Sequence, residues 1–372
     1  MATLLDLLKA TVQMEGSDLH LTVNSPPMVR VHGHLQALPV PALTEADSKT
    51  LAYSVLTDSQ KKRFEQELEL DFAFGIRTLG RFRCNVFHQR GSVAAAYRLV
   101  PSEIRTFQEL GLPAVVQRFA DLPRGLVLVT GPTGSGKSTT LATLVDKINT
   151  DRRGHILTIE DPIEFVHAHK GCVVNQRELH LDTRGFASAL RAAMREDPDV
   201  VLIGELRDLE TTEAALRVAE TGHLTLATLH TNSASQTINR LLDMFPSHQL
   251  DHIRVQLSLV LEGVICQTLM ATTTGLGRAL ATEVLVPTNG IRNLIRENKI
   301  HQIYSAMQAG QEKIGTQTFN QSLSSLVSQR RITRDTALSV ARPRDELEQM
   351  LDRGVGLPVN RVPRPDLRTV RT

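Results

Sequence analysis

The alternation of hydrophobic and polar positions changes near residue 113, and this change predicts two domains. In the first part, period-2 alternation in "DLHLTV" and "PPMVRVHGHLQAL" predicts short strands, and "ADSKTLAYSVLTDSQKKRFEQE" predicts a solvated helical segment. Alternation returns in "DFAFGIRTLGRFRCNVFHQRGSVAAAYRLV", where glycines indicate a hairpin or meander. The pattern predicts a small α+β domain over residues 1–100 and a linker over residues 101–112.

From residue 113 onward, short apolar runs alternate with helical segments. The runs "GLVLVTG", "HILTIED", "DVVLIGE" and "LTLATLH" predict strands, and residues 138–149 and 185–196 predict helices. This alternation is typical of βαβ units, in which helices cover both faces of a sheet. We therefore predict an α/β domain over residues 113–345.

The last third of the chain has a mainly helical pattern. "SASQTINRLLDMF" and "DHIRVQLSLVLEGVICQTLM" predict helices, and "RALATEVLV" predicts a strand that interrupts them. The end of the chain is rich in Pro, Arg and Gly and lacks periodicity, which predicts a flexible tail over residues 346–372.

Composition narrows the range of partners. The chain has 42 Lys and Arg against 40 Asp and Glu, so a nucleic-acid binder dominated by phosphate neutralisation is not expected. Three scattered cysteines favour a reducing compartment over a disulfide framework. Charged residues interrupt the N-terminal apolar stretch, and no apolar run reaches the ~20 residues that span a bilayer. We expect contact with a membrane only through partners.

The strongest chemical signal is "GPTGSGKST", which follows an apolar strand and precedes a helical segment. It matches the phosphate-loop pattern GxxxxGK[ST] at every fixed position. Glycines let backbone N–H groups surround phosphate oxygens, the helix N-terminus attracts anions, and the lysine adds a cation. The residues expected to bind nucleotide are Gly131, Pro132, Thr133, Gly134, Ser135, Gly136, Lys137, Ser138 and Thr139, with Ser138 also a Mg²⁺ ligand.

Carboxylates follow two of the predicted strands. Glu205 comes after the apolar run 200–203, where it can polarise a water and orient Mg²⁺ through its shell, although surface acids after strands are common. Glu160, Asp161 and Glu164 follow another strand. They indicate either a cation or water network or the acidic start of a helix around Pro162, and the sequence leaves both open.

Histidines and arginines supply further candidates. His223 and His230 flank an apolar strand, where each is either an ordinary polar residue at a strand end or a sensor of the γ-phosphate. A zinc site is disfavoured because no further ligand lies at the required spacing. The arginines of the first domain either face solvent or reach the γ-phosphate of a neighbouring subunit: Arg81, Arg83 and Arg98.

Together these motifs resemble the secretion ATPases of type II secretion and type IV pilus systems, and among them the pilus retraction motors. The phosphate loop, "TIEDPIEFVH", "DPDVVLIGELRD" and "GHLTLATLHTN" occur in that family's order. "NGIRNLIRENKIHQIYSAMQAGQ" resembles an element of the retraction motors, with Gly290 where that element begins with Ala. Extension motors of the superfamily carry a tetracysteine zinc insert, which three dispersed cysteines cannot form.

The resemblance implies a RecA-like ATPase domain joined to a smaller N-terminal PAS-like α+β domain, assembled as a homohexamer that hydrolyses ATP with Mg²⁺. It implies Glu205 as the catalytic glutamate and a cytoplasmic motor, peripheral to the inner membrane, that pulls on a pilus platform protein, with or without a paralogous retraction ATPase. The other implied roles are organisation of water or Mg²⁺ by Glu160 and Glu164, contact with the γ-phosphate by His230 and His223, and contact with nucleotide between domains or subunits by Arg81, Arg83 or Arg98.

Two alternatives belong to other classes. A RecA-like nucleic-acid translocase would need aromatic side chains that stack on bases, but the chain has no Trp and only three Tyr. A nucleotide-binding accessory subunit would not need an intact Lys137, Ser138 and Glu205.

The retraction-type element at residues 291–301 predicts an amphipathic helix. Ile291, Leu294 and Ile295 form an apolar stripe that is expected to pack into the domain. The remaining side chains predict a polar surface that relays motion or contacts a partner: Arg292, Asn293, Arg296 and Glu297.

Overall fold

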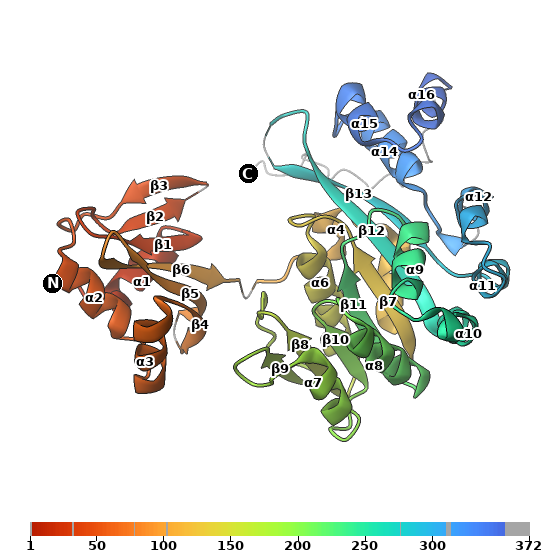
Figure 1. The fold of residues 1–372 in the computed structure, drawn as a ribbon. Coiled ribbons are helices and arrows are strands. Elements are labelled where there is room, and N and C mark those ends of the chain that lie inside the picture. The colour runs from red at the N-terminus through yellow and green to blue at the C-terminus, as the bar shows by residue number, and fades with distance from the viewer. Residues whose placement is uncertain are drawn as a thin grey trace, which may run out of the picture. The chain divides into compact units, whose positions relative to one another are not determined.

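The computed structural model describes residues 2–31, 33–77, 79–101, 103–275, 277–309 and 314–353. The chain divides into two compact units (Figure 1). The N-terminal unit contains Met1–Ile104 with the short segments Pro162–Ala168 and His180–Asp182, and the C-terminal unit contains the remaining residues. Each unit has its own sheet and its own hydrophobic core.

The N-terminal unit is built on an antiparallel sheet with the strand order β3-β2-β1-β6-β5-β4. One face of this sheet shares a core with the helices, in which Leu8, Phe64 and Tyr97 are fully buried. The α+β character expected from the sequence is confirmed. The elements are α1 (Leu4–Gln13), β1 (Asp18–Leu21), β2 (Met28–Val31), β3 (His34–Ala37), α2 (Glu45–Tyr53), α3 (Asp58–Glu67), β4 (Glu69–Ile76), β5 (Gly80–Gln89) and β6 (Ser92–Val100).

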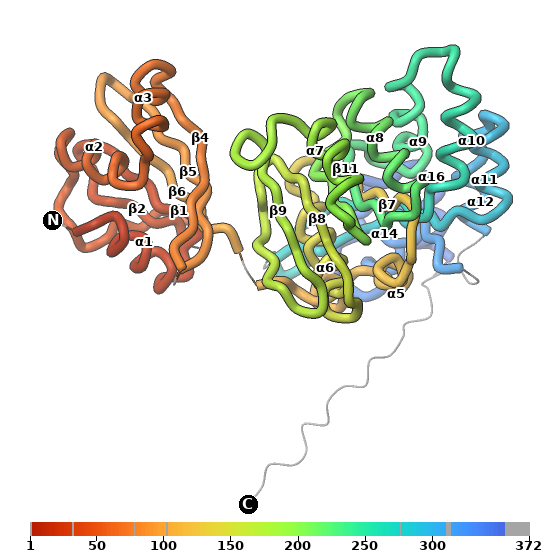
Figure 2. Tube along the Cα trace, turned by 90° about the horizontal axis from the view of Figure 1, so that it is seen from below, coloured from red at the N-terminus to blue at the C-terminus, as the bar shows by residue number. Residues whose placement is uncertain are grey.

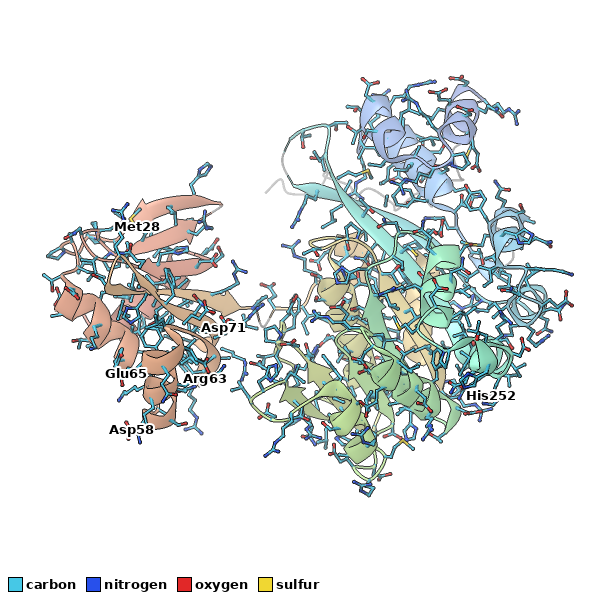
Figure 3. The ribbon with its side chains drawn as sticks, in the orientation of Figure 1. Met28, Asp58, Arg63, Glu65, Asp71 and His252 are labelled. Atoms are coloured by element: carbon cyan, nitrogen blue, oxygen red, sulfur yellow. The ribbon has the colours of Figure 1, made fainter. Side chains whose placement is uncertain are left out.

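Threonine capping boxes set the starts of the N-terminal helices. In each box the threonine hydroxyl accepts the N–H of the third helical residue, whose side chain accepts the N–H of the threonine; the caps are Thr3, Thr44 and Thr57. The helical segment expected near residues 46–67 is therefore two helices, because Thr57 starts a second one. α3 buries only Phe64, and its polar side chains project from the unit, as Figure 3 shows for Asp58, Arg63 and Glu65.

The sheet face that points away from this core carries a buried carboxylate, Asp18 of β1. Its side chain is only 9% exposed; Arg98 Nε donates to it at 2.7 Å, and Arg30 Nε lies 4.0 Å away. Burial favours the neutral acid, but hydrogen bonds from Ser17 and Arg98 outweigh burial and hold the pKa of Asp18 below its ordinary value. Arg98 therefore has a structural partner within its own unit.

The C-terminal unit is an α/β structure with the strand order β13-β12-β7-β11-β10-β8-β9 (Figures 1 and 2). Among the described residues, all neighbouring strands run parallel except β12 and β13. Its strands are β7 (Gly125–Thr130), β8 (His155–Glu160), β9 (Val173–Glu178), β10 (Val200–Ile203), β11 (Leu224–Leu229), β12 (Leu261–Ala271) and β13 (Arg278–Leu285).

Helices cover both faces of this sheet, as the βαβ pattern predicts. Val127 and Val129 of β7 pack toward α5 and α6, whereas Leu126 and Leu128 belong to the core of α7, α8, α9 and α10. The helices are α4 (Phe107–Leu110), α5 (Ala114–Arg118), α6 (Lys137–Asp151), α7 (Phe186–Ala193), α8 (Leu209–Glu220), α9 (Ala234–Leu242), α10 (Leu250–Val260), α11 (Asn289–Arg296), α12 (Ile303–Ala309), α14 (Phe319–Ser328), α15 (Arg334–Val340) and α16 (Arg344–Asp352).

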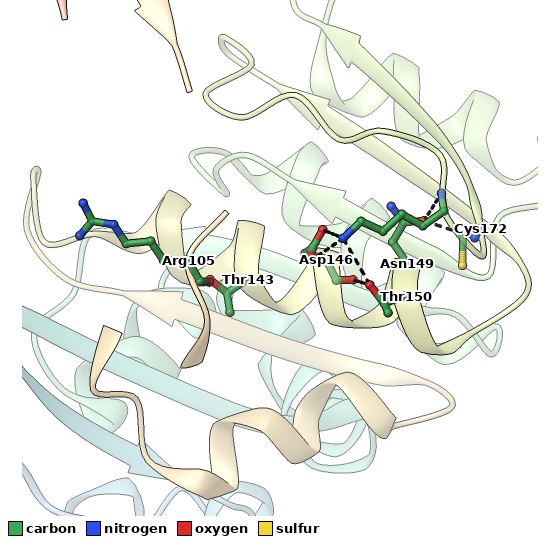
Figure 4. A network of polar contacts seen from close by, with 7 residues as sticks. Arg105, Thr143, Asp146, Asn149, Thr150 and Cys172 are labelled. Carbon is green, nitrogen blue, oxygen red and sulfur yellow. Dashed lines mark hydrogen bonds and ion pairs between the residues drawn. The ribbon is translucent and has the colours of Figure 1, made fainter. Parts of the chain in front are cut away.

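Polar contacts hold α6 in position along its whole length (Figure 4). Thr143 donates to the backbone carbonyl of Arg105 at 2.8 Å, near the start of the unit. At the other end, the buried Asn149 accepts the backbone N–H groups of Lys170 and Cys172 at 3.1 and 3.2 Å. These bonds fix the helix that begins directly after the glycine-rich loop.

One expectation about the last third of the chain is wrong. The run expected to be helical throughout residues 251–270 ends its helix at Val260, and β12 then pairs in parallel with β7. A continuous apolar run is compatible with a buried strand as well as with a buried helix, so its periodicity cannot decide between them. Of the tail expected to be flexible at residues 346–372, residues 346–352 belong to α16, which buries Leu347. Residues 354–372 lie outside the described residues, and for them the expectation stays a prediction.

The buried Asp18 leads to a stability prediction. Arg98→Ala should destabilise the N-terminal unit by about 1 kcal/mol at neutral pH, because a desolvated carboxylate loses a charged donor while Arg30 remains nearby. The lowered pKa of Asp18 stabilises the unit above the ordinary carboxyl range, and this contribution is lost as the pH falls through that pKa. The difference between variant and wild type should therefore shrink in acid.

Hydrogen exchange of the β1 and β6 amides, measured against pH, checks this effect. Arg83→Ala is the matched control, because Arg83 lies beside Arg98 on the same sheet face and forms no ion pair within the described residues. Equal protection in both variants would contradict the structural role of Arg98.

Candidate active site

The glycine-rich loop after β7 adopts a backbone that side chains do not tolerate. Gly131 and Gly136 have φ values of 139° and 88°, in the region that favours glycine. A Cβ on Gly131 would lie 2.2 Å from the carbonyl oxygen of Gln267. The loop therefore needs glycine both for its conformation and for its contact with β12.

The loop leads directly into α6 and leaves its first turn free of a side-chain cap. Gly136 is the N-cap residue and makes no side-chain hydrogen bond, so the first N–H groups of α6 can take an anion. Lys137, the first residue of the helix, donates to the carbonyls of Gly131 and Pro132 at 2.9 and 3.2 Å. The structure thus brings the expected nucleotide-binding residues together in one turn.

Gln267 of β12 supports this loop and was not expected from the sequence. Its side-chain amide donates to the carbonyl of Ser135 at 2.8 Å, and the side chain is almost completely buried. In the sequence, Gln267 is a polar residue within an apolar run, which could have marked it. Because residues 261–270 were expected to form a helix, its side chain was not expected to face the loop. In the strand, Gln267 lies directly against the loop.

The parallel strands place three more candidates at the same edge of the sheet as the loop. β11 lies between β7 and β10, and β8 follows β10, so the residues after these strands share one edge. Strands are about 4.8 Å apart, which puts the end of β10 roughly 10 Å from the end of β7. The residues brought to this edge are Glu205, His230 and Glu160.

Glu205 lies two residues past the end of β10 and is held by two cationic or ionisable groups. Its Oε2 is 2.8 Å from an Arg207 nitrogen, and its Oε1 is 3.3 Å from His230 Nε2. Burial favours the neutral acid, but Arg207 and His230 outweigh it and hold the pKa of Glu205 below that of an ordinary glutamate. Glu205 is therefore ionised at neutral pH and can accept a proton or a hydrogen bond.

Arg207 is a second residue that sequence reasoning missed. It is exposed over 62% of its side chain, while the Glu205 side chain is 20% exposed. The only signal was its place two residues after the glutamate in "GELRD".

Glu160 lies at the end of β8, next to Gly204. Its Oε1 accepts from Thr158 at 2.7 Å and from Gln176 at 3.1 Å. A Cβ on Gly204 would lie 3.2 Å from the Glu160 Cα, so glycine lets the ends of β8 and β10 approach closely. No helix begins at Pro162 in the described chain, which removes the capping alternative for these acids.

Glu164 and the candidate arginines belong to the N-terminal unit. Glu164 lies in the segment Pro162–Ala168, which groups with that unit. Arg83 and Arg98 are cross-strand partners on β5 and β6, and Arg81 lies two residues before Arg83 on the same face. Roles for these four residues at the nucleotide remain predictions.

His223 does not lie at the edge that carries the loop. It precedes β11, its carbonyl accepts the N–H of Gly125 at 3.1 Å, and its Nδ1 lies 3.0 Å from the Val218 carbonyl oxygen. Gly125 starts β7, whereas the phosphate loop follows its end, about 20 Å away along the strand. The expected contact between His223 and the γ-phosphate is therefore wrong for nucleotide held on the phosphate loop of the same chain.

The amphipathic helix expected at 291–301 corresponds to α11, which ends at Arg296, and its apolar stripe is buried as expected at Ile291 and Ile295. Arg292 is not part of a free polar surface. It donates to the carbonyls of Ser258 and Leu259, at the end of α10, and lies 2.9 Å from Glu262. These contacts fix α11 at the start of β12, which lies at the sheet edge opposite to the phosphate loop. Removing Arg292 would therefore disturb the packing of α11 as well as any relay of motion.

Within the described residues, none of the helices has both the length and the apolar character needed to cross a bilayer.

A phosphate loop at the end of a parallel strand, with an ionised glutamate two strands away, defines a P-loop ATPase with a RecA-like fold. The chain belongs to the type II/IV secretion system protein family, whose model matches residues 6–336.

Two relatives and one solved structure are similar to this chain over most of their length. The "Type IV pilus retractation ATPase PilT" of Pseudomonas aeruginosa is 50% identical over 337 residues, which cover 91% of this chain and 97% of the relative. A "Twitching motility protein" of Neisseria gonorrhoeae is 49% identical over 311 residues, or 84% and 83% of the two chains. A crystal structure of the pilus retraction motor PilT with bound ADP has a TM-score of 0.88 and 51% identity, covering 94% and 100%.

The loop geometry predicts the effect of Lys137→Ala. Hydrolysis should fall by at least about a hundredfold and ATP affinity should weaken, because the phosphates lose their nearest cation. The fold should be retained, since Lys137 is only half-buried at the helix start. ATPase rates and thermal unfolding of the purified protein measure both effects.

Lys147→Ala is the matched control on the same helix. Ten residues of helix separate Lys147 from Lys137 by about 15 Å, and its partners are Asp121 and Asp151. Retained hydrolysis in Lys137→Ala, or an equal loss in Lys147→Ala, would contradict the assignment of the loop.

The contacts of Glu205 predict a different defect for Glu205→Gln. ATP binding should persist while kcat falls by about 10²- to 10³-fold, because the amide keeps the shape but cannot take the proton of the attacking water. In the wild type, the acid limb of kcat should lie below the range in which an ordinary glutamate titrates, since the pKa of Glu205 is lowered.

Steady-state kinetics between acid and neutral pH test this assignment, with Glu210→Gln as control. Glu210 is an exposed residue of α8 paired with Arg191. Loss of ATP affinity with an unchanged kcat in Glu205→Gln would show that Glu205 is not the catalytic carboxylate.

Proposed function

We propose that this chain is an ATP-hydrolysing motor that powers type IV pilus retraction. The observation that carries the proposal is the edge of the C-terminal sheet, where the phosphate loop, Glu205 and His230 meet within a family of secretion ATPases. Relatives that are about half identical over most of their length are named for pilus retraction and twitching motility. Both lines support the same class of motor.

The chemistry of hydrolysis follows from the site residues. The N–H groups of the loop and the start of α6 bind the phosphates, and Lys137 neutralises the charge that develops on the terminal phosphate. Glu205, held ionised by Arg207 and His230, orients the attacking water and accepts its proton. Glu160 organises the neighbouring water through the polar shell of Thr158 and Gln176.

The site also fits Mg²⁺. Mg²⁺ prefers oxygen ligands, and it usually binds one or two protein groups together with substrate phosphates. The Ser138 hydroxyl, in the first turn of α6, would hold the ion together with phosphate oxygens, and Glu205, which follows β10, would hold water beside it. When bound, the ion would neutralise charge on the phosphates.

The proposed assembly is a homohexamer in which the N-terminal unit completes a neighbouring nucleotide site. Arg81 and Arg83 are the proposed candidates for this contact, and Arg98 is paired with Asp18 within its own unit. An arginine supplied by a neighbour raises hydrolysis by orders of magnitude in other phosphoryl-transfer enzymes. Hydrolysis would then depend on the packing between subunits.

The proposed partner is the pilus platform protein of the inner membrane, with a paralogous retraction ATPase as a second candidate. The motor would work at the cytoplasmic face of that membrane and reach it only through the pilus machinery. Nucleic acid is not a proposed partner, because the charge balance and the lack of Trp give it no stacking or phosphate-neutralising surface in the sequence.

Loss of the gene tests the direction of force. Cells without this protein should carry more surface pili than the wild type and should not twitch, because pili extend but are not withdrawn. Pilus counts by electron microscopy and twitching assays measure the two effects. A copy carrying Glu205→Gln should fail to restore twitching, whereas Glu210→Gln should restore it.

Cells that lose their pili altogether would contradict retraction and indicate an extension motor. Purified protein whose ATPase rate rises strongly with single-stranded DNA would instead support the nucleic-acid translocase.

A further inference from the structure

Glu283, a buried glutamate of β13, has no part in the site as described above. Its side chain is 3% exposed, and it lies opposite Cys266 of β12 in the sheet. A glutamate is almost never this deeply buried without partners. Its contacts therefore indicate what it does.

Glu283 lies against the first residues of two helices. The N–H of Ala234, the first residue of α9, donates to Glu283 Oε1 at 2.7 Å. The backbone N–H of Phe319, the first residue of α14, faces the same carboxyl group, whose pKa is raised by burial above that of an ordinary glutamate. One carboxyl group thus joins the N-terminal ends of two helices that are far apart in sequence.

The first of these helices is attached to the active site. Only the segment 230–233 separates the end of β11 from α9, and it begins with His230, which contacts Glu205 at 3.3 Å. Within the same turn, the Thr231 and Thr237 hydroxyls share a hydrogen bond of 2.7 Å. The position of His230 is therefore set by β11 on one side and by the start of α9 on the other.

The second helix belongs to the C-terminal helical group. α14 packs on β12 and β13 together with α15 and α16, through a small core that includes Met270, Leu323, Leu326 and Leu347. The backbone of β13 is tied to the same helix, since the Thr282 N–H donates to Ser322 at 3.1 Å. A shift of α9 at Glu283 would therefore reach α14 directly.

We propose that Glu283 is a positioning residue for ATP hydrolysis, which holds the His230 segment at Glu205 and connects it to the C-terminal helices through α14. Its carboxyl group fixes the start of α9, so the imidazole of His230 stays within reach of Glu205. When nucleotide at the loop changes the contacts of His230, α9 transmits the change to Glu283 and α14. The inference rests on ATP hydrolysis at the phosphate loop and not on the assignment to pilus retraction.

The test combines kinetics with a fluorescence signal. The chain has no tryptophan, so Phe319→Trp introduces one fluorophore at the start of α14, and its emission should change when ATP and Mg²⁺ are added. In this background, Glu283→Gln should lower kcat by about ten- to a hundredfold while the KM for ATP stays within about twofold. The fluorescence change should be lost at the same time.

Ala234→Pro is a second variant, and it removes the hydrogen bond from the start of α9 to Glu283. Proline is favourable at the first position of a helix, and Ser233 before it already has extended backbone, but proline has no N–H to donate. It should reproduce the kinetic and fluorescence defects of Glu283→Gln, and the two changes together should cost no more than either alone.

Leu326→Ala is the matched control for loss of packing. It removes a buried side chain of α14 away from Glu283, and it should lower the thermal midpoint without changing kcat by more than about twofold. If Leu326→Ala lowers kcat as much as Glu283→Gln at equal stability, Glu283 has only a structural role. A retained fluorescence change in Glu283→Gln, or equal changes in kcat and KM, would also overturn the proposal. Each of these results leaves the pilus assignment untouched, because pili are absent from the assay.

Discussion

The nucleotide site of this molecule depends on one constraint, the close approach of neighbouring backbones at the carboxyl edge of the C-terminal sheet. Glycine makes that approach possible in two places. Gly131 lies against the Gln267 carbonyl, where a Cβ would be only 2.2 Å from the oxygen, and Gly204 lies against Glu160. With side chains at these positions the strand ends would move apart, and the loop and the carboxylates would no longer share a site.

The strand ends at this edge carry groups of opposite charge. The end of β7 and the start of α6 offer N–H groups and Lys137, which suit the phosphates. The end of β10 offers Glu205, which Arg207 and His230 keep ionised although burial opposes it. Because β11 lies between β7 and β10, there is room between Lys137 and Glu205 for the terminal phosphate and a water. The N-terminal ends of the same strands carry different features, including His223 and the Arg292 contact with α10.

Much of this site could be predicted from the sequence because its parts are local. The phosphate loop needs glycines and a lysine at fixed spacing, and Glu205 follows a short apolar run, so neither depends on distant residues. The parts that could not be predicted depend on pairing between remote segments. Gln267 reaches the loop only because residues 261–271 form a strand and not a helix. His223 and His230 looked equivalent in sequence, and only the strand direction shows that they lie at opposite edges. Arg292 looked like a surface residue until its contacts with the end of α10 were known.

We propose that Glu205 acts on the terminal phosphate of ATP held by the loop at residues 131–139. A crystal structure of the full chain with Mg²⁺ and a non-hydrolysable ATP analogue would measure this directly. We expect phosphate oxygens on the N–H groups of the loop, and one water between the terminal phosphate and Glu205, within hydrogen-bond distance of both. A terminal phosphate bound away from the loop, or a Glu205 carboxylate with no water between it and that phosphate, would show that Glu205 does not act on the bound nucleotide.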